Sequence, residues 1–380
     1  MEIEQFIKFI KETLPITRSY CDFRTDLHSI LEKYKTNINL IDNHYFKSND
    51  DRKETISKIE KCIQLLLDTV DWEYKGCHGE AYNTFKDVMN GSFFPSIELL
   101  KIKATSLNND NYFFKIRKID KDGEYTYKDM FHIPLNKREI IPNNRYSSTG
   151  YPCLYLGKSI LDCWEELRRP EFDKLIVSCY KVVKDFSVYD LRIPREIDYI
   201  NNLQNTLIRL PIVISCLFKV IKDNEPFKPE YLIPKMIIET IISNNFKSIS
   251  IDGDYNNKFW GIIYTSSHII KDFQDNHNVF DNIAFPVIQP EHKEYYCNYL
   301  ASIFSITNPI SFKDTELKNS TNTICNNNTI TNMFTLEKHL NRNEYFVIDH
   351  LFIDRKFLTI PSDGTAQNLN IDTNLPYTIH

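Results

Sequence analysis

Residues 145–166 read Arg145-Tyr-Ser-Ser-Thr-Gly-Tyr-Pro-Cys-Leu-Tyr-Leu-Gly-Lys-Ser-Ile-Leu-Asp-Cys-Trp-Glu-Glu166. The run Tyr151–Leu156 is short, apolar and aromatic, and a glycine bounds it on each side, at Gly150 and at Gly157. Such a run between turn residues is typical of a buried strand. The segment therefore places a cation, a tight turn and a strand in direct succession.

A helix is predicted to follow this strand. Ser159 and Asp162 have the spacing of a capping box at the beginning of a helix, and Pro170 provides its end. At about 100° per residue, Glu166 falls on the margin of the buried face, whereas Glu165 points away from that face into solvent. The apolar residues of the face follow the i, i+3, i+4, i+7 spacing: Ile160, Cys163, Trp164 and Leu167.

A carboxylate at the edge of a core, one strand away from an arginine, has two interpretations. Glu166 and Arg145 can form an ion pair that only stabilises the structure, or they can bind and act on a charged ligand. Structural ion pairs also perturb carboxylates, so the spacing alone leaves both interpretations open.

The segment resembles the RES domain family. The family pattern begins with an Arg, an aromatic residue and an Asn or Ser, and a Gly follows a few residues later. It continues with Tyr-Leu and then Ala or Gly. It ends with a Ser and, seven residues after that Ser, a Glu. The chain matches this pattern without a gap, through Arg145, Tyr146, Ser147, Gly150, Tyr155, Leu156, Gly157, Ser159 and Glu166. Three further blocks resemble the family and occur in its order, namely Met130–Arg138, Tyr231–Glu239 and Gly261–Ser266.

The resemblance extends over about residues 112–290 and implies an α+β fold. The expected core is an ADP-ribosyltransferase-like mixed or antiparallel sheet with helices around it. Members of the family cleave the nicotinamide-ribose bond of NAD, by hydrolysis or phosphorolysis, or transfer ADP-ribose to a protein. NAD would then be a substrate, and no prosthetic group is expected.

The resemblance also assigns roles to residues. Glu166 would face the positive charge that develops on the ribose as nicotinamide leaves. Arg145 would bind the pyrophosphate through its planar guanidinium. Tyr146 or Tyr155 would stack on the nicotinamide ring, and Ser266 would hydrogen-bond the ribose or the nicotinamide. Without the resemblance, the tyrosines read as core residues and the serine as a residue that caps a turn.

One departure from the family pattern occurs in the first strand. The family carries an aromatic-Arg-x-Arg sequence there, and this chain has Phe113-Phe-Lys-Ile-Arg117. Strand alternation puts Lys115 and Arg117 on one face, so either or both are expected to bind NAD, with Arg117 preferred. Lysine would keep the charge but lose the bidentate geometry.

Composition excludes several function classes. The 380-residue chain has 46 Lys and Arg against 51 Asp and Glu, so no general basic field favours nucleic acid. Neither a Rossmann fingerprint nor a P-loop occurs among its 9 glycines. The 9 cysteines form no CxxC pair, which predicts reduced thiols, and no metal site is expected. No signal peptide or membrane span is readable, so a cytoplasmic protein without membrane contact is predicted.

Two domains are predicted. Residues 1–105 show helical patterns, beginning with an amphipathic helix at residues 3–10, and would form an all-helical domain that regulates the site or binds a partner. Residues 106–380 would form the NAD-cleaving domain, with C-terminal strands at about 342–362. Residues 196–245 are expected to be helical, and residues 318–332 to be an exposed loop. The predicted strands are Leu175–Tyr180, Phe186–Leu191, Ser248–Gly253, Gly261–Tyr264, Tyr345–Asp349 and Lys356–Ile360.

The leading hypothesis is therefore an NAD glycohydrolase or phosphorylase that depletes NAD, as the toxin of a toxin-antitoxin or phage-defence module. A neutralising antitoxin or a regulatory protein is the expected partner. A protein ADP-ribosyltransferase, with a protein acceptor of ADP-ribose, is the first alternative. A catalytically silent module that binds an NAD-like ligand or a protein is the alternative from another class, because Lys115 stands where an arginine is expected.

Overall fold

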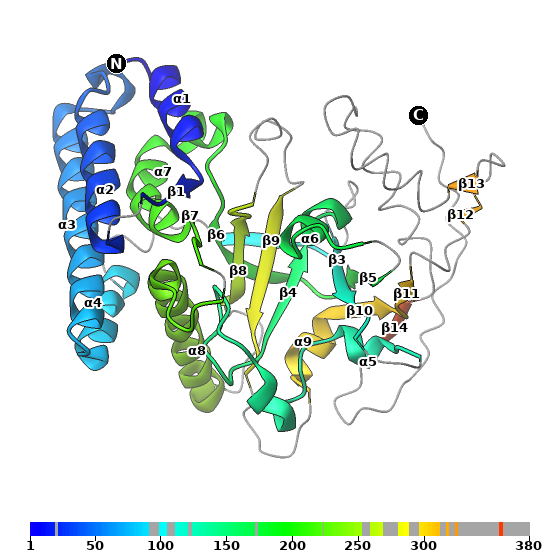
Figure 1. Cartoon of the computed structure of the whole chain (residues 1–380). Coiled ribbons are helices and arrows are strands. Elements are labelled where there is room, and N and C mark those ends of the chain that lie inside the picture. Colours follow the sequence, from blue (N-terminus) through cyan, green and yellow to red (C-terminus); the bar gives the residue numbers. More distant parts are fainter. Residues whose placement is uncertain are drawn as a thin grey trace.

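The computed structural model describes residues 1–19, 22–90, 99–104, 111–120, 124–171, 174–222, 224–252, 259–268, 280–288, 296–311, 317–318, 324–325 and 357–359. Within these ranges the chain is α+β, with a mixed sheet and helices packed against both of its faces (Figure 1). The predicted α+β class is confirmed. None of the helices in these ranges combines the length and the apolar character needed to cross a membrane.

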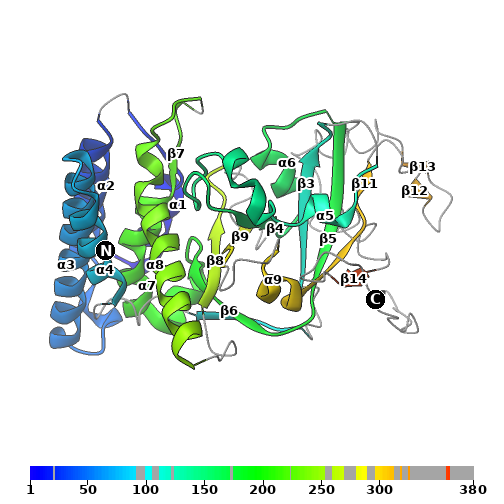
Figure 2. The ribbon, with the colours of Figure 1, turned by 90° about the horizontal axis from the view of Figure 1, so that it is seen from below.

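Three of the four amino-terminal helices, α2, α3 and α4, form an outer layer, and α7 and α8 lie between this layer and the strands (Figures 1 and 2). The remaining helix, α1, lies beside α7, where Phe6 packs edge-on against Tyr199. The predicted amphipathic helix at residues 3–10 is confirmed, because α1 buries Ile3, Phe6, Ile7 and Ile10. The six helices are α1 (Ile3–Thr13), α2 (Phe23–Asn39), α3 (Asn49–Tyr74), α4 (His78–Asn90), α7 (Glu196–Cys216) and α8 (Leu232–Asp252).

Neighbouring strands of the main sheet run antiparallel except β6 and β8, which are parallel. The short strand β11 (Ile310–Ser311) pairs with β5 beside this path. In spatial order the strands are β14 (Phe357–Thr359), β10 (Phe304–Thr307), β5 (Leu175–Val182), β3 (Tyr112–Lys118), β4 (Cys153–Gly157), β9 (Asp281–Pro286), β8 (Phe259–Thr265), β6 (Phe186–Leu191) and β2 (Leu99–Ile102).

The two faces of the sheet bury different cores, because successive side chains of a strand point to opposite sides. On β8, Ile262 belongs to the core shared with α7, α8 and the amino-terminal helices. The next residue, Ile263, belongs to the core shared with α5 (Tyr127–Met130) and α9 (Asn298–Ile303). The amino-terminal helices thus share one continuous core with the sheet, and the boundary predicted at residue 105 stays a prediction.

Several short elements complete the described part of the structure. The strand β1 (Ile16–Thr17) pairs in parallel with β7 (Phe218–Lys219), and β12 (Leu317–Lys318) pairs with β13 (Ile324–Cys325). The remaining elements are α6 (Ile160–Glu166) and the 3₁₀ helices η1 (Asn43–Tyr45), η3 (Leu135–Ile140) and η5 (Pro229–Tyr231).

Most predicted elements that fall in the described ranges are confirmed, including β5, β6, β8, β14 and the helices of residues 196–245. The strand predicted at Ser248–Gly253 is wrong, because α8 continues to Asp252. No glycine or proline interrupts the sequence between Lys235 and Gly253, so nothing ends the helix earlier. The strand predicted at Tyr345–Asp349 lies outside the described residues, as does most of the loop predicted at 318–332.

Candidate functional site

The helix α6 carries Glu166 and packs tightly against β4. The hydroxyl of Ser159 accepts a hydrogen bond from the Asp162 amide at 3.0 Å, which caps the helix as the sequence predicts. Gly157 ends β4 directly before this turn, and a Cβ atom there would lie 2.5 Å from the Cys163 sulfur. Glycine is therefore required at this position for the helix to approach the strand.

Two neutral donors hold the carboxylate of Glu166. The Ser266 hydroxyl donates to Glu166 Oε1 at 2.5 Å, and Asn282 Nδ2 donates to the same oxygen at 3.0 Å. Ser266 is fully buried, and its oxygen also accepts the backbone amide of His268 at 3.0 Å. These contacts orient the carboxylate and leave its negative charge without a paired cation among the described residues.

The exposure predicted for the two glutamates of α6 is reversed in the structure. Glu166 is exposed, whereas Glu165 is only 7% exposed. The chain turns sharply after the helix, with positive φ angles at Arg168 (65°) and Arg169 (51°). This turn brings Arg169 back over Glu165, with 2.8 Å between Nη2 and Oε1. The prediction that Glu165 is solvated is wrong because it treats the helix without the turn that covers it.

Arg145 is anchored by the backbone of another segment. Its Nη1 donates to the carbonyl of Cys216 and its Nη2 to the carbonyl of Phe218, both at 2.9 Å. Nη2 also donates to the Ser267 hydroxyl at 3.1 Å. The guanidinium lies 5.1 Å from the centroid of the Tyr231 ring, in a cation-π contact. Arg145 is thus fixed in place, and two of its five N–H groups make no hydrogen bond to the described residues.

Glu166 and Arg145 line the same cavity, whose volume is about 320 Å³. This size is at the lower end of the range for small-molecule sites. The walls combine one carboxylate with cationic and aromatic side chains. The lining residues are Asn144, Arg145, Tyr155, Glu166, Arg168, Val220, Lys228, Tyr231, Tyr264, Ser267 and His268.

The two tyrosines predicted to contact the ligand differ in position. Tyr155 lines the cavity, and its hydroxyl donates to Ser147 Oγ at 3.3 Å and accepts the Tyr146 amide at 3.2 Å. Tyr146 is buried behind the cavity wall, with its ring centroid 4.4 Å from that of Tyr264. Tyr146 does not line the cavity itself, and its ring packs against Tyr264, which does.

Lys115 and Arg117 do not line the cavity. Both point to the same side of β3, as strand alternation predicts, and both donate to backbone carbonyls at and after α5. Lys115 Nζ donates to Phe131 O at 2.7 Å, and Arg117 Nη1 donates to Asp129 O at 3.1 Å. Burial, with a smaller contribution from Arg117, lowers the pKa of Lys115 to about 8. Their predicted role in binding NAD stays a prediction.

A second carboxyl group lies beneath Glu166. Asp162 is fully buried one helical turn before Glu166, and Asn282 lies beside both carboxyl groups. Within the described part of the chain, neither oxygen of Asp162 has a hydrogen-bond partner of good geometry. Burial, and then the charge of Glu166, raises the pKa of Asp162 well above its usual value.

Buried ion pairs join the strands β6 and β9 near Asn282. Arg192 Nη2 lies 2.6 Å from Asp190 Oδ2, and its Nη1 lies 3.4 Å from Asp281 Oδ2. The side chains of these three residues are at most 14% exposed. Arg192 thereby ties β6 to β9, next to Asn282.

Comparison with known proteins identifies a relative. This chain is 32% identical, over 337 residues, to a protein of Bacillus subtilis (strain 168) named "Putative toxin YopC". The matched region is 82% of this chain and 72% of that protein. The chain belongs to the YopC family. No family model matches the sequence, and no solved structure matches it.

In this YopC family member, the sequence did not single out several residues of the site. Tyr231 and Tyr264 fall inside the blocks that resemble the RES family, which is a signal that could have selected them. Asn282 and His268 have no local signal, because their contacts with Glu166 and Arg168 span about a hundred residues of sequence. Arg168 Nη1 lies 2.8 Å from His268 Nδ1, and burial lowers the pKa of this histidine.

Proposed function

We propose that this protein is a toxin of the RES domain type that cleaves the nicotinamide-ribose bond of NAD. Two findings support the proposal. The YopC relative carries the name of a toxin. The cavity contains Arg145, Glu166 and Tyr155 of the RES pattern, and Ser266, from the Gly261–Ser266 block, donates a hydrogen bond directly to Glu166. A neutralising protein partner is part of the same proposal.

The geometry of Glu166 carries the proposal. Both hydrogen bonds that it makes with described residues end on Oε1, so Oε2 is available to a ribose hydroxyl. The donors are a hydroxyl and an amide, so neither neutralises the carboxylate. When nicotinamide leaves, positive charge develops on the ribose, and a fixed anion next to it lowers the energy of the transition state.

The other walls of the cavity fit the remaining parts of NAD. A pyrophosphate carries two negative charges, and Arg145, Arg168 and Lys228 provide cations for it. The nicotinamide ring is positively charged before cleavage, and an aromatic face attracts such a ring. Tyr155 and Tyr264 offer aromatic surface on the cavity walls.

Expression in bacterial cells tests the proposal. The wild-type protein is expected to arrest growth and to deplete cellular NAD, whereas soluble Glu166→Gln protein at the same level leaves both unchanged. Arrested growth with a normal NAD content would refute NAD as the target. Equal toxicity of the two proteins would refute the role of Glu166.

A further inference from the structure

The position of Arg145 depends on a strand that pairs with the amino-terminal segment. Its guanidinium donates to the carbonyls of Cys216, at the end of α7, and of Phe218, in β7. The partner of β7 is β1, with Ile16 opposite Phe218. The Ile16 amide donates to the carbonyl of Leu217 at 2.9 Å. The backbone that holds Arg145 is therefore itself held by residues that link α1 to α2.

A side-chain contact strengthens this connection. Phe23, the first residue of α2, packs edge-on against Phe218 with 5.1 Å between the ring centroids. Both rings are fully buried. The strand β7 thus contacts the amino-terminal helices through its backbone and through its phenylalanine.

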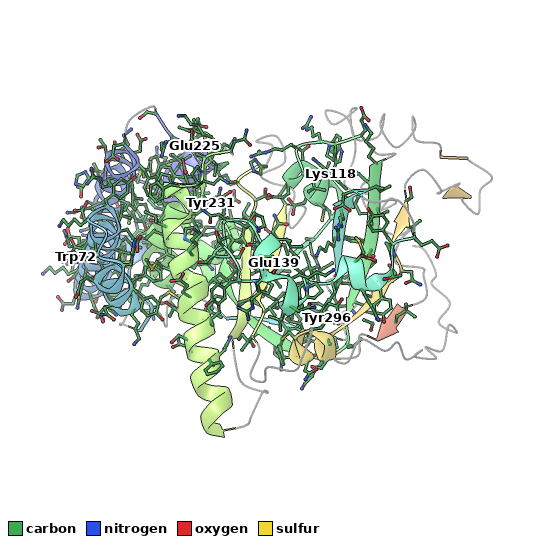
Figure 3. The ribbon with its side chains drawn as sticks, turned by 60° about the horizontal axis from the view of Figure 1, so that its bottom comes forward. Trp72, Lys118, Glu139, Glu225, Tyr231 and Tyr296 are labelled. Carbon is green, nitrogen blue, oxygen red and sulfur yellow. The ribbon has the colours of Figure 1, made fainter. Side chains whose placement is uncertain are left out.

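The aromatic support of Arg145 depends on the same segment. Arg18 Nη1 lies 3.2 Å from Glu230 Oε1, and the two side chains are 18% and 2% exposed. Glu230 precedes Tyr231 in η5, and the Tyr231 ring lies 5.1 Å from Arg145 and 5.4 Å from Lys228 Nζ. Tyr231 is labelled in Figure 3 near the beginning of α8. Removing Arg18 would leave a buried carboxylate without its cation, next to this wall of the cavity.

We propose that Arg18 is a positioning residue for the substrate, and that residues 16–18 hold the cationic wall of the cavity in its binding geometry. The inference rests on the proposed function for the identity of the substrate. It gives the amino-terminal helices a role in binding NAD without any contact between them and the ligand. A partner that displaced this segment would weaken NAD binding.

Kinetics of Arg18→Met test the proposal, because methionine retains an apolar stem and removes the charge. The expected result is a KM for NAD that rises about 10-fold, with kcat changed less than about 3-fold, because Arg18 acts on binding and not on Glu166. Lys35→Met is the matched control. Lys35 pairs with Glu60 at 3.2 Å between α2 and α3, whereas the Arg18 pair joins the segment between α1 and α2 to η5. The control is expected to keep the wild-type KM.

Arg18→Lys, which keeps the charge, provides a second variant if Arg18→Met fails to fold. A KM increase of about 3-fold is expected, because the lysine ammonium replaces the planar guanidinium that contacts Glu230 through Nη1. A wild-type KM in a folded Arg18 variant would overturn the inference, as would a loss confined to kcat. Hydrogen exchange supplies a readout that needs no turnover. Arg18→Met is expected to accelerate exchange at residues 216–219 and 228–231, and Lys35→Met is not. Unchanged exchange overturns the inference, whereas a wild-type protein that leaves NAD intact refutes only the proposed function.

Discussion

Replacement of Glu166 by glutamine should separate the charge of this side chain from its structural contacts. The glutamine carbonyl oxygen can still accept from Ser266 and Asn282, which now bond to Oε1 at 2.5 and 3.0 Å. Both bonds change from charge-assisted to neutral, so the free energy of unfolding should fall by about 1 kcal/mol for each bond. The fold and the cavity should remain.

The effect on the rate should be much larger. Losing one fixed electrostatic group at the site where charge develops typically lowers kcat by about 10²–10³-fold, or about 2.7–4 kcal/mol in the transition state. The assay is the release of nicotinamide from NAD by purified protein at saturating NAD. KM should change far less than kcat, because the carboxylate acts on the transition state.

The adjacent glutamate provides a matched control. Glu165→Gln removes the same charge one residue earlier on α6, from a side chain that pairs with Arg169 and does not line the cavity. Its kcat should stay within about 2-fold of the wild-type value. Because Arg169 is 46% exposed, the lost ion pair should lower the free energy of unfolding by only about 1 kcal/mol. A folded Glu166→Gln variant with the wild-type kcat, or equal losses in both variants, would refute the reasoning.

Three further predictions concern stability. Arg192→Met removes the nearest cation of two buried carboxylates, so that Asp281 loses its ion pair and Asp190 keeps only Arg209, whose Nη1 lies 3.7 Å from Asp190 Oδ2. The substitution should lower the free energy of unfolding by about 3–5 kcal/mol in urea titration, and a loss below about 1 kcal/mol would contradict the account of these pairs. Gly157→Ala should lower it by about 1–3 kcal/mol, because the new methyl group overlaps Cys163, and an unchanged urea midpoint would show that the packing of α6 is misjudged. Burial raises the pKa of Asp162 in the folded protein, so the folded state holds this proton more tightly than the unfolded state does. The stability that Asp162 contributes is therefore lost as pH rises above its unfolded pKa of about 3.9. Relative to the wild type, Asp162→Asn should gain in Tm from pH 5 to pH 8. A gain that is independent of pH would show that Asp162 has an ordinary pKa.

The elements of the site were predictable from the sequence because their signals are local. Gly150 has a φ of 80°, which is the backbone conformation that a tight glycine turn requires. The strand β4 and the cap at Ser159 also follow from residues that are neighbours in the chain. The sequence therefore placed Arg145 and Glu166 on the correct elements.

The contacts of the site were not predictable, because they join distant segments. The helical wheel of α6 misplaced Glu165, since burial there depends on the left-handed turn at residues 168–169. Arg145 is anchored by carbonyls more than seventy residues away, and backbone acceptors carry no sequence signature. Lys115 and Arg117 share a face as predicted, but only the position of α5 shows that this face meets backbone carbonyls.

Product analysis with purified protein tests the central claim most directly. Wild-type and Glu166→Gln protein are incubated with NAD, with and without phosphate and cell lysate, and the products are resolved by mass. The account predicts free nicotinamide with the wild type and intact NAD with the variant, and the form of the released ADP-ribose identifies water, phosphate or protein as the acceptor. Intact NAD with the wild type under every condition would contradict the account.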